Sequence, residues 1–153
     1  MDVRNGIAAR PVLVIGYGNT LRGDDGVGQH VALAVSKWNV PGLSAMSVHQ
    51  LTAELAEPIA SAELVIFVDA KFTAPGDLVK IQPIHSSSTA FNIGHTSDPR
   101  CLLALADAVY GRIPPAWLVS VPAADFSMRD GLSATASRGA KLAVARIGEL
   151  IGA

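Results

Sequence analysis

The chain of 153 residues fits one domain and is long enough to bury a hydrophobic core, with 50% of its residues hydrophobic and 16% charged. Its 12 basic and 13 acidic residues give a net charge of −1 without a dense run of Lys or Arg, so nucleic acid is not an expected partner. The longest apolar runs are far too short to span a bilayer, and a single cysteine excludes a disulfide within the chain. These properties predict a cytoplasmic protein that binds neither membrane nor nucleic acid.

Five apolar segments are expected to form strands. The first and third are continuous apolar runs, which are typical of strands buried on both faces of a sheet, whereas the fourth alternates polar and apolar residues and is expected at an edge. The expected strands are Pro11–Gly16, Leu43–Leu51, Leu64–Ala70, Asp77–Pro83 and Ala116–Pro122. Residues 1–10 are expected to be a ragged segment before the first strand.

Apolar residues at helical spacing follow several of these strands. The first helix is expected within residues 27–38. Thr52 is expected to cap a short second helix, and Asp98 and Ser133 are expected to cap two later ones. The polar segment 84–97 has no periodicity, and a loop of this length is uncommon unless it is functional or mobile.

Strands that alternate with helices predict an α/β fold, here a single-domain, three-layer α/β/α architecture over residues 1–153 with a mostly parallel, twisted, five-stranded sheet. Right-handed crossovers would place the second and third strands on opposite sides of the first. Ligands in such folds bind where the strand order reverses, outside the carboxyl ends of the strands. Asp25 follows the first strand and Asp69 ends the third, so both carboxylates should face this crevice.

The segment VLVIGYGNTLRGDDGVG, residues 12–28, joins the first strand to the first helix and has the layout of a phosphate-binding loop. Gly16 and Gly18 match the first two glycines of the dinucleotide-binding pattern, but Leu21 occupies the third position. The acidic pair that follows would also repel a pyrophosphate. A nucleotide is therefore not the expected ligand, although a domain that binds a nucleotide or another small molecule stays an alternative.

A metal site is the interpretation that the same loop favours more. Asp25, Asp69 and His95 offer two carboxylates and an imidazole, a ligand set that suits a divalent ion such as Ni, Zn, Fe or Mn. Each residue also has an ordinary explanation: a loop acid near a helix N-terminus, a turn acid and a solvated loop histidine. From the residues alone, both interpretations stay open. His85 is the one reasonable substitute for His95.

Other reactive side chains are weaker candidates. Cys101 lies in the first turn of an expected helix without an activating base nearby in the sequence, so a small buried residue is expected there. His30 and His49 are expected to be packing or surface residues. A Ser-His-Asp triad built on Ser86–Ser88 would need partners that the sequence does not place.

Four segments in a fixed order resemble the hydrogenase maturation proteases, the endopeptidases that remove the C-terminal extension of the [NiFe]-hydrogenase large subunit after nickel insertion. The segments are GYGNTLRGDDGVG, VIFVDA, GHTSDPRCLLALADAVYG and VSVPAADFSMRDGLSATA, and the resemblance covers almost the whole chain from Val12. It implies that Asp25, Asp69 and His95 contact the metal, with Asp25 and Asp69 as the catalytic carboxylates. Asp25 stands where some members have Glu, which could change the reach to the ion. Arg129 and Asp130 depart from the family's usual pair, which is expected to affect substrate contact and not to abolish activity.

The resemblance therefore implies an endopeptidase that acts, as a monomer, on a [NiFe]-hydrogenase large-subunit precursor. The nickel would be supplied by the substrate, and no nucleotide would be needed. Either the metal or a carboxylate could activate the attacking water, and the sequence leaves both open. The alternative function is a checkpoint or chaperone protein that binds the nickel-loaded partner, or nickel itself, without cleaving anything.

Overall fold

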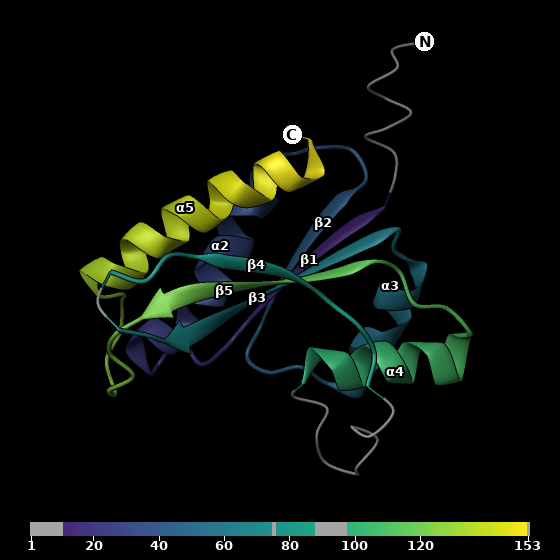
Figure 1. The fold of residues 1–153 in the computed structure, drawn as a ribbon, viewed down its shortest axis with the longest axis horizontal. Helices are drawn as coiled ribbons and strands as arrows, with labels where there is room; N and C mark the ends of the chain where they lie inside the picture. The colour runs from purple at the N-terminus through teal and green to yellow at the C-terminus, as the bar shows by residue number, and fades with distance from the viewer. Residues whose placement is uncertain (1–10, 75, 88–97, 153) are drawn as a thin grey trace.

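The computed structural model describes residues 11–74, 76–87 and 98–152, which form three layers, with helices on both faces of one sheet (Figure 1). The sheet has the strand order β2-β1-β3-β5-β4, and its first four strands are parallel while β4 is antiparallel to β5. The strands are β1 (Val12–Tyr17), β2 (Leu43–Val48), β3 (Leu64–Phe72), β4 (Lys80–Ile84) and β5 (Ala116–Ala123). The predicted α/β fold with a mostly parallel five-stranded sheet is confirmed.

The strand order reverses at β1, as right-handed crossovers predict. On one side Val14 of β1 pairs with Ala45 of β2, and on the other side it pairs with Ile66 of β3. The carboxyl ends of β1 and β3 therefore border the crevice in which ligands of such sheets bind. The expected edge position of β4 is also confirmed.

Among the described residues, two helices cover each face of the sheet (Figure 1). Helices α2 (Val27–Ser36) and α5 (Ala134–Ile151) pack on one face, and helices α3 (Ala56–Ser61) and α4 (Pro99–Tyr110) pack on the other. No helix within the described residues is long and apolar enough to cross a membrane. The expected ragged segment 1–10 lies outside the described residues.

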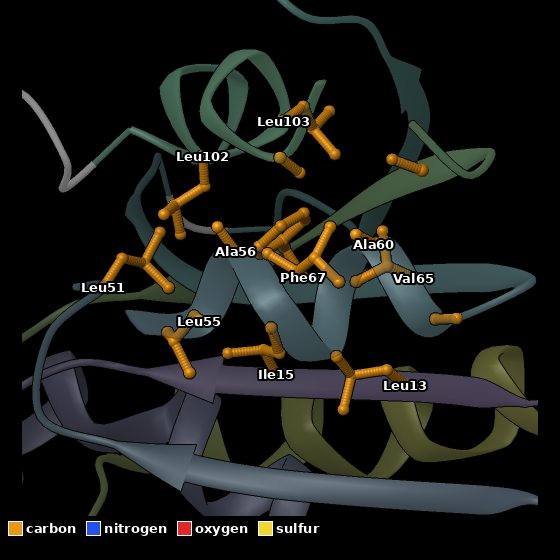
Figure 2. Close-up of a cluster of buried hydrophobic side chains, with 14 of the residues drawn as sticks. Leu13, Ile15, Leu51, Leu55, Ala56, Ala60, Val65, Phe67, Leu102 and Leu103 are labelled. Atoms are coloured by element: carbon orange, nitrogen blue, oxygen red, sulfur yellow. The ribbon is translucent and has the colours of Figure 1, made fainter. Parts of the chain in front are cut away.

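Strand residues alternate between the two cores because successive side chains point to opposite faces. Ile15 of β1 and Phe67 of β3 are fully buried beneath α3 and α4 (Figure 2), and burial of a side chain of this size contributes about 1.5–3 kcal/mol. Tyr17 and Asp69 are the next residues of the same two strands on this face. The two apolar rows thus end in a phenol and a carboxyl group at the carboxyl edge of the sheet.

The N-terminus of α2 lies directly against the sheet because two glycines leave room for it. A Cβ on Gly16 would collide with the carbonyl group of Gly28, and a Cβ on Gly28 would collide with the carbonyl oxygen of Val68. Both contacts are with backbone atoms that cannot move aside. The glycines of the loop therefore bring the start of α2 to the crevice between β1 and β3.

Most predicted helix ends are confirmed. The Asp98 carboxylate accepts a hydrogen bond from the Arg100 N–H at 2.9 Å, and the Ser133 hydroxyl accepts one from the Ala136 N–H at 3.2 Å, so both residues cap their helices. Thr52 occupies the predicted N-cap position, ahead of the 3-10 turn Ala53–Leu55, but its hydroxyl donates to the Glu54 carboxylate at 2.9 Å and accepts from no backbone N–H.

Strand β3 continues two residues beyond its predicted end and stops at Phe72. Asp69 consequently lies inside the paired region, opposite Ser120 of β5, instead of at the strand end. Strand β3 pairs with β5 both before and after Asp69, from Val65 to Phe72. A carboxylate carried by a paired strand is better fixed than one carried by a loop.

Candidate active site

The loop after β1 turns sharply at Gly18, whose φ of 140° is in the region that favours glycine. A Cβ on Gly18 would collide with the carbonyl oxygen of Asp25. The Gln29 side chain donates to the Gly18 carbonyl at 2.7 Å, and the Asn19 side chain accepts from the Leu21 N–H at 2.9 Å. The Asn19 side chain therefore braces the turn.

Asp25 lies at the inner side of this turn and is half-buried. Its Oδ2 accepts a hydrogen bond from the backbone N–H of Asn19 at 2.8 Å. It precedes α2 by two residues, where the positive end of the helix dipole favours a negative charge. The loop backbone therefore orients the Asp25 carboxylate.

Asp69 is the second carboxylate of the crevice. Burial raises its pKa to about 6, hydrogen bonds from the Ala70 N–H and the Tyr17 hydroxyl oppose this rise, and the charge of Asp25 adds to it. The charge of Asp25 acts on Asp69, and the register that pairs Gly16 with Val68 sets the start of the loop after β1 beside Asp69. The structure thus brings together the two acids that the sequence predicted to face one crevice.

Tyr17 is a residue of this site that the sequence analysis missed. It is buried, at 8% exposed, and burial together with the neighbouring charge of Asp69 raises the pKa of its phenol well above the usual value of 10. Tyr17 therefore stays protonated and donates its hydrogen bond to Asp69. The signal was available in the sequence, because the period of two in β1 puts Tyr17 on the face of β3 that carries Asp69.

Asp24, the neighbour of Asp25, faces away from the crevice and is fully buried. Its carboxylate accepts four hydrogen bonds: from the N–H groups of Ala124 at 2.8 Å, Asp125 at 3.0 Å and Ser133 at 2.7 Å, and from the Ser133 hydroxyl at 2.6 Å. Burial alone would raise the pKa of Asp24, but these bonds outweigh it and lower the pKa below 3.8. Asp24 therefore fastens the loop to the segment that joins β5 to α5.

Arg129, one of the residues that depart from the family pattern, belongs to the same connection. Its carbonyl accepts from the Gly23 N–H at 2.9 Å, and its N–H donates to the Leu21 carbonyl at 3.1 Å. Its guanidinium pairs with the Asp125 carboxylate at 3.0 Å. The backbone of Arg129 thus holds the glycine-rich loop, while Asp130 next to it is exposed.

Nearly all amide groups of the glycine-rich loop already donate to protein acceptors. These donors are the N–H groups of Gly18, Asn19, Leu21, Arg22, Gly23, Asp24 and Asp25. Loops that bind phosphate keep such groups available for the ligand. This loop uses them to hold its own shape.

The four histidines differ in their relation to the crevice. His95 lies outside the described residues. His85 follows β4 and lies at the amino end of the parallel strands. Its position along the sheet is five residues before that of Asp69, which corresponds to about 15 Å. The prediction that His85 could substitute for His95 is therefore wrong. His30 and His49 are exposed, as expected.

Cys101 is buried in the first turn of α4, as expected, and burial followed by the charge of Asp98 raises the pKa of its thiol. A raised pKa disfavours the nucleophilic thiolate. Within residues 11–74, 76–87 and 98–152, no three His, Cys, Asp or Glu side chains gather closely enough to hold a metal ion. Among the described residues, the crevice therefore offers two carboxylates, Asp25 and Asp69, as possible metal ligands.

We expect Gly18→Ala to destabilise the protein by about 2–4 kcal/mol, since the new methyl group must displace the Asp25 backbone in addition to straining the turn. Gly111→Ala is the matched control, because Gly111 also has a positive φ, of 71°, yet a Cβ there meets no atom within 4 Å. That control should lose only about 1 kcal/mol. Urea unfolding measures both, and equal losses would contradict the close approach of Gly18 to Asp25.

Together these features define an α/β protein with a paired-carboxylate site at the point where the strand order reverses. No protein-family model matches the chain, and no curated protein sequence matches it either. Its fold is similar to that of solved structures of peptidases.

One similar structure is the hydrogenase 2 maturation peptidase from a Thaumarchaeota archaeon, with 23% identity, a TM-score of 0.68, and coverage of 94% of this chain and 99% of that one. Another is the [NiFe] hydrogenase maturation protease HybD from Thermococcus kodakarensis, with 19% identity, a TM-score of 0.69, and coverage of 92% and 99%. The hydrogenase maturating endopeptidase HybD from E. coli has 20% identity, a TM-score of 0.64, and coverage of 92% and 91%. The shared fold extends over nearly the full length of all these chains.

Proposed function

We propose that this protein belongs to the hydrogenase maturation proteases and is an endopeptidase that removes the C-terminal extension of a [NiFe]-hydrogenase large-subunit precursor. The observation that carries the proposal is the convergence of Asp25 and Asp69 at the strand reversal, in a fold similar to that of maturation endopeptidases. The protein acts in the cytoplasm, as a monomer.

The metal of the reaction is the nickel that the precursor already carries, and its proposed contacts are Asp25, Asp69 and His95. Two carboxylates and an imidazole fit a divalent ion of this kind. His95 precedes Asp98 by three residues, and three residues of chain reach at most about 10 Å. The charge of Asp98 acts on Tyr17, the partner of Asp69, which supports the proposed contact of His95 with the metal in the crevice.

Asp69 suits the role of general base in peptide hydrolysis, because a pKa of about 6 lies near the pH at which it would work. It would take a proton from the attacking water and return it to the amine that leaves. The substrate's nickel polarises the scissile carbonyl when it is bound. Tyr17 holds the Asp69 carboxylate, and Asp25 supplies the second anionic contact with the metal-bearing substrate.

The saturated amide groups of the loop support the related proposal that no nucleotide is bound. A phosphate would have to displace bonds such as that of the Gly23 N–H to Arg129 or of the Asn19 N–H to Asp25. It would also approach the two acidic side chains of the crevice, Asp25 and Asp69. Both effects oppose an anionic ligand at this loop.

Mass spectrometry of a large-subunit precursor, incubated with the protein with and without bound nickel, tests the proposal. We expect loss of a C-terminal peptide from the nickel-loaded precursor only, and we expect Asp25→Ala and His95→Ala to abolish it. The matched control is His49→Ala, because His49 is exposed and has no role in the proposed site.

Two other outcomes would change the conclusion. A nickel-dependent complex that is never cleaved, and that the same variants abolish, would make the protein a checkpoint binder. Cleavage that needs no nickel and that neither variant reduces would place the catalytic groups elsewhere in the molecule.

A further inference from the structure

A groove of about 370 Å³ lies at the carboxyl ends of β3 and β5 and extends to the edge strand β4. Its polar lining is Lys71, Thr73, Asp77, Lys80 and Ser120, and it is called the lysine groove below. None of these residues has a part in the proposed catalysis. The groove therefore needs an explanation of its own.

The pairing of the strands makes the lysine groove a direct continuation of the site at Asp69. Asp69 pairs with Ser120 of β5, and Ser120 pairs with Lys80 of β4, so the three residues form one row across the same face of the sheet. Neighbouring strands lie about 4.8 Å apart, which puts Lys80 about 10 Å from Asp69. Lys71 follows Asp69 by two residues in β3 and thus lies on this face as well.

The lining has the chemistry of a site for a carboxylate. Lys71 and Lys80 are exposed, and among the described residues neither takes part in an ion pair. The Thr73 hydroxyl is buried and has no hydrogen-bond partner among them. The lining includes one acid, Asp77, so two ammonium groups outnumber it. A bound carboxylate would balance the excess positive charge of this lining.

We propose that the lysine groove binds a carboxylate of the released segment of the substrate, two to four residues beyond the bond that is cut. This inference rests on the proposed protease function. In this proposal the nickel-bearing body of the substrate occupies the crevice between β1 and β3, and the released segment runs toward β5 and β4, the side on which the two lysines lie. A distance of about 10 Å corresponds to three residues of extended chain. The carboxylate is either an acidic side chain or, in a short segment, the end of the chain.

The double variant Lys71→Met, Lys80→Met tests the inference, since Met keeps the apolar stem of each side chain and removes its charge. On a nickel-loaded precursor with acids two to four residues beyond the cut, we expect KM to rise about tenfold with kcat within twofold. On the same precursor with Asn and Gln at those acids, the double variant should match the wild type. The matched control is Lys37→Met, Lys141→Met, two exposed lysines of the α2 and α5 layer, which should behave as the wild type on both precursors.

A binding measurement separates this inference from the protease proposal. Labelled hexapeptides with two Asp residues, with two Asn residues, and with a free or an amidated C-terminus are titrated by fluorescence anisotropy. Preferential binding of the Asp peptide, lost in the Lys71→Met, Lys80→Met variant, supports a groove for acidic side chains even if no precursor is cut. Preference for the free C-terminus over the amide supports the chain end as the source of the carboxylate. Equal binding of all peptides, or cleavage kinetics that the lysines do not affect, overturns the inference and leaves the protease proposal intact.

Discussion

Replacing Asp69 with Asn is expected to lower kcat/KM for cleavage of the nickel-loaded precursor by about 10²–10⁴-fold. The amide keeps the shape of the side chain and still accepts the hydrogen bond from Tyr17, but it can neither take a proton from water nor contribute charge to a nickel contact. Single-turnover cleavage, followed by mass spectrometry, measures the loss. Asp107→Asn is the matched control, because Asp107 is an exposed acid of α4 outside the proposed site and the lysine groove.

The pH dependence of the wild type provides an independent check of the same residue. If Asp69 must be ionised, kcat/KM rises with pH up to about 6 and is level above it, because this parameter reports the pKa values of the free enzyme. An unchanged profile over this range, or an Asp69→Asn variant with wild-type activity, would contradict the role of Asp69 as base.

The same substitution should stabilise the protein at neutral pH. The folded state holds the pKa of Asp69 at about 6, above its ordinary 3.8, so the folded state binds the proton more tightly than the unfolded state. Stability therefore falls as the pH rises from about 4 to about 6 and stays lower above that. The shift corresponds to at most about 3 kcal/mol. Asp69→Asn should thus gain stability at pH 8 and none at pH 4. A residue that lowers stability at working pH is typical of a functional site and not of a structural one.

The arrangement of the fold could be predicted from local patterns in the sequence. Continuous apolar runs such as LVIFV indicate buried strands, and the handedness of crossovers then sets β2 and β3 on either side of β1. That argument alone brings Asp25 and Asp69 to one crevice. It needs only the order of the elements and no detail of side-chain packing.

The different roles of the adjacent acids Asp24 and Asp25 could not be predicted in this way. Asp24 and Asp25 have the same chemistry and neighbouring positions, yet their side chains point in different directions. The partners of Asp24 lie 100 to 109 residues away in the sequence, in the connection between β5 and α5. No local pattern identifies contacts of that separation. Tyr17 is different, because strand alternation together with the β1–β3 register is enough to place it beside Asp69.

Removal of the Asp24 carboxylate is expected to have the largest effect on stability. Asp24→Ala leaves four donors without their acceptor, and it releases both the glycine-rich loop and the start of α5. Loss of a buried, fully hydrogen-bonded charge costs about 3–5 kcal/mol, a large part of the stability of a domain. Urea unfolding followed by circular dichroism measures the loss, and Asp130→Ala, an exposed acid nearby, should cost less than about 0.5 kcal/mol.

The dependence of stability on pH distinguishes the loss of the Asp24 charge from the loss of a hydrogen-bonding side chain at this position. Hydrogen bonds hold the pKa of Asp24 below 3.8, so its stabilising effect is complete above that pH and disappears as the pH falls through the folded-state pKa. The gap between wild type and Asp24→Asn should therefore narrow below about pH 4. Because Asp24 orients the loop that carries Asp25, Asp24→Asn should also lose cleavage activity at a low temperature at which the variant is still folded. A variant with wild-type stability and activity would mean that the loop needs no anchor, and that the strand end alone positions Asp25.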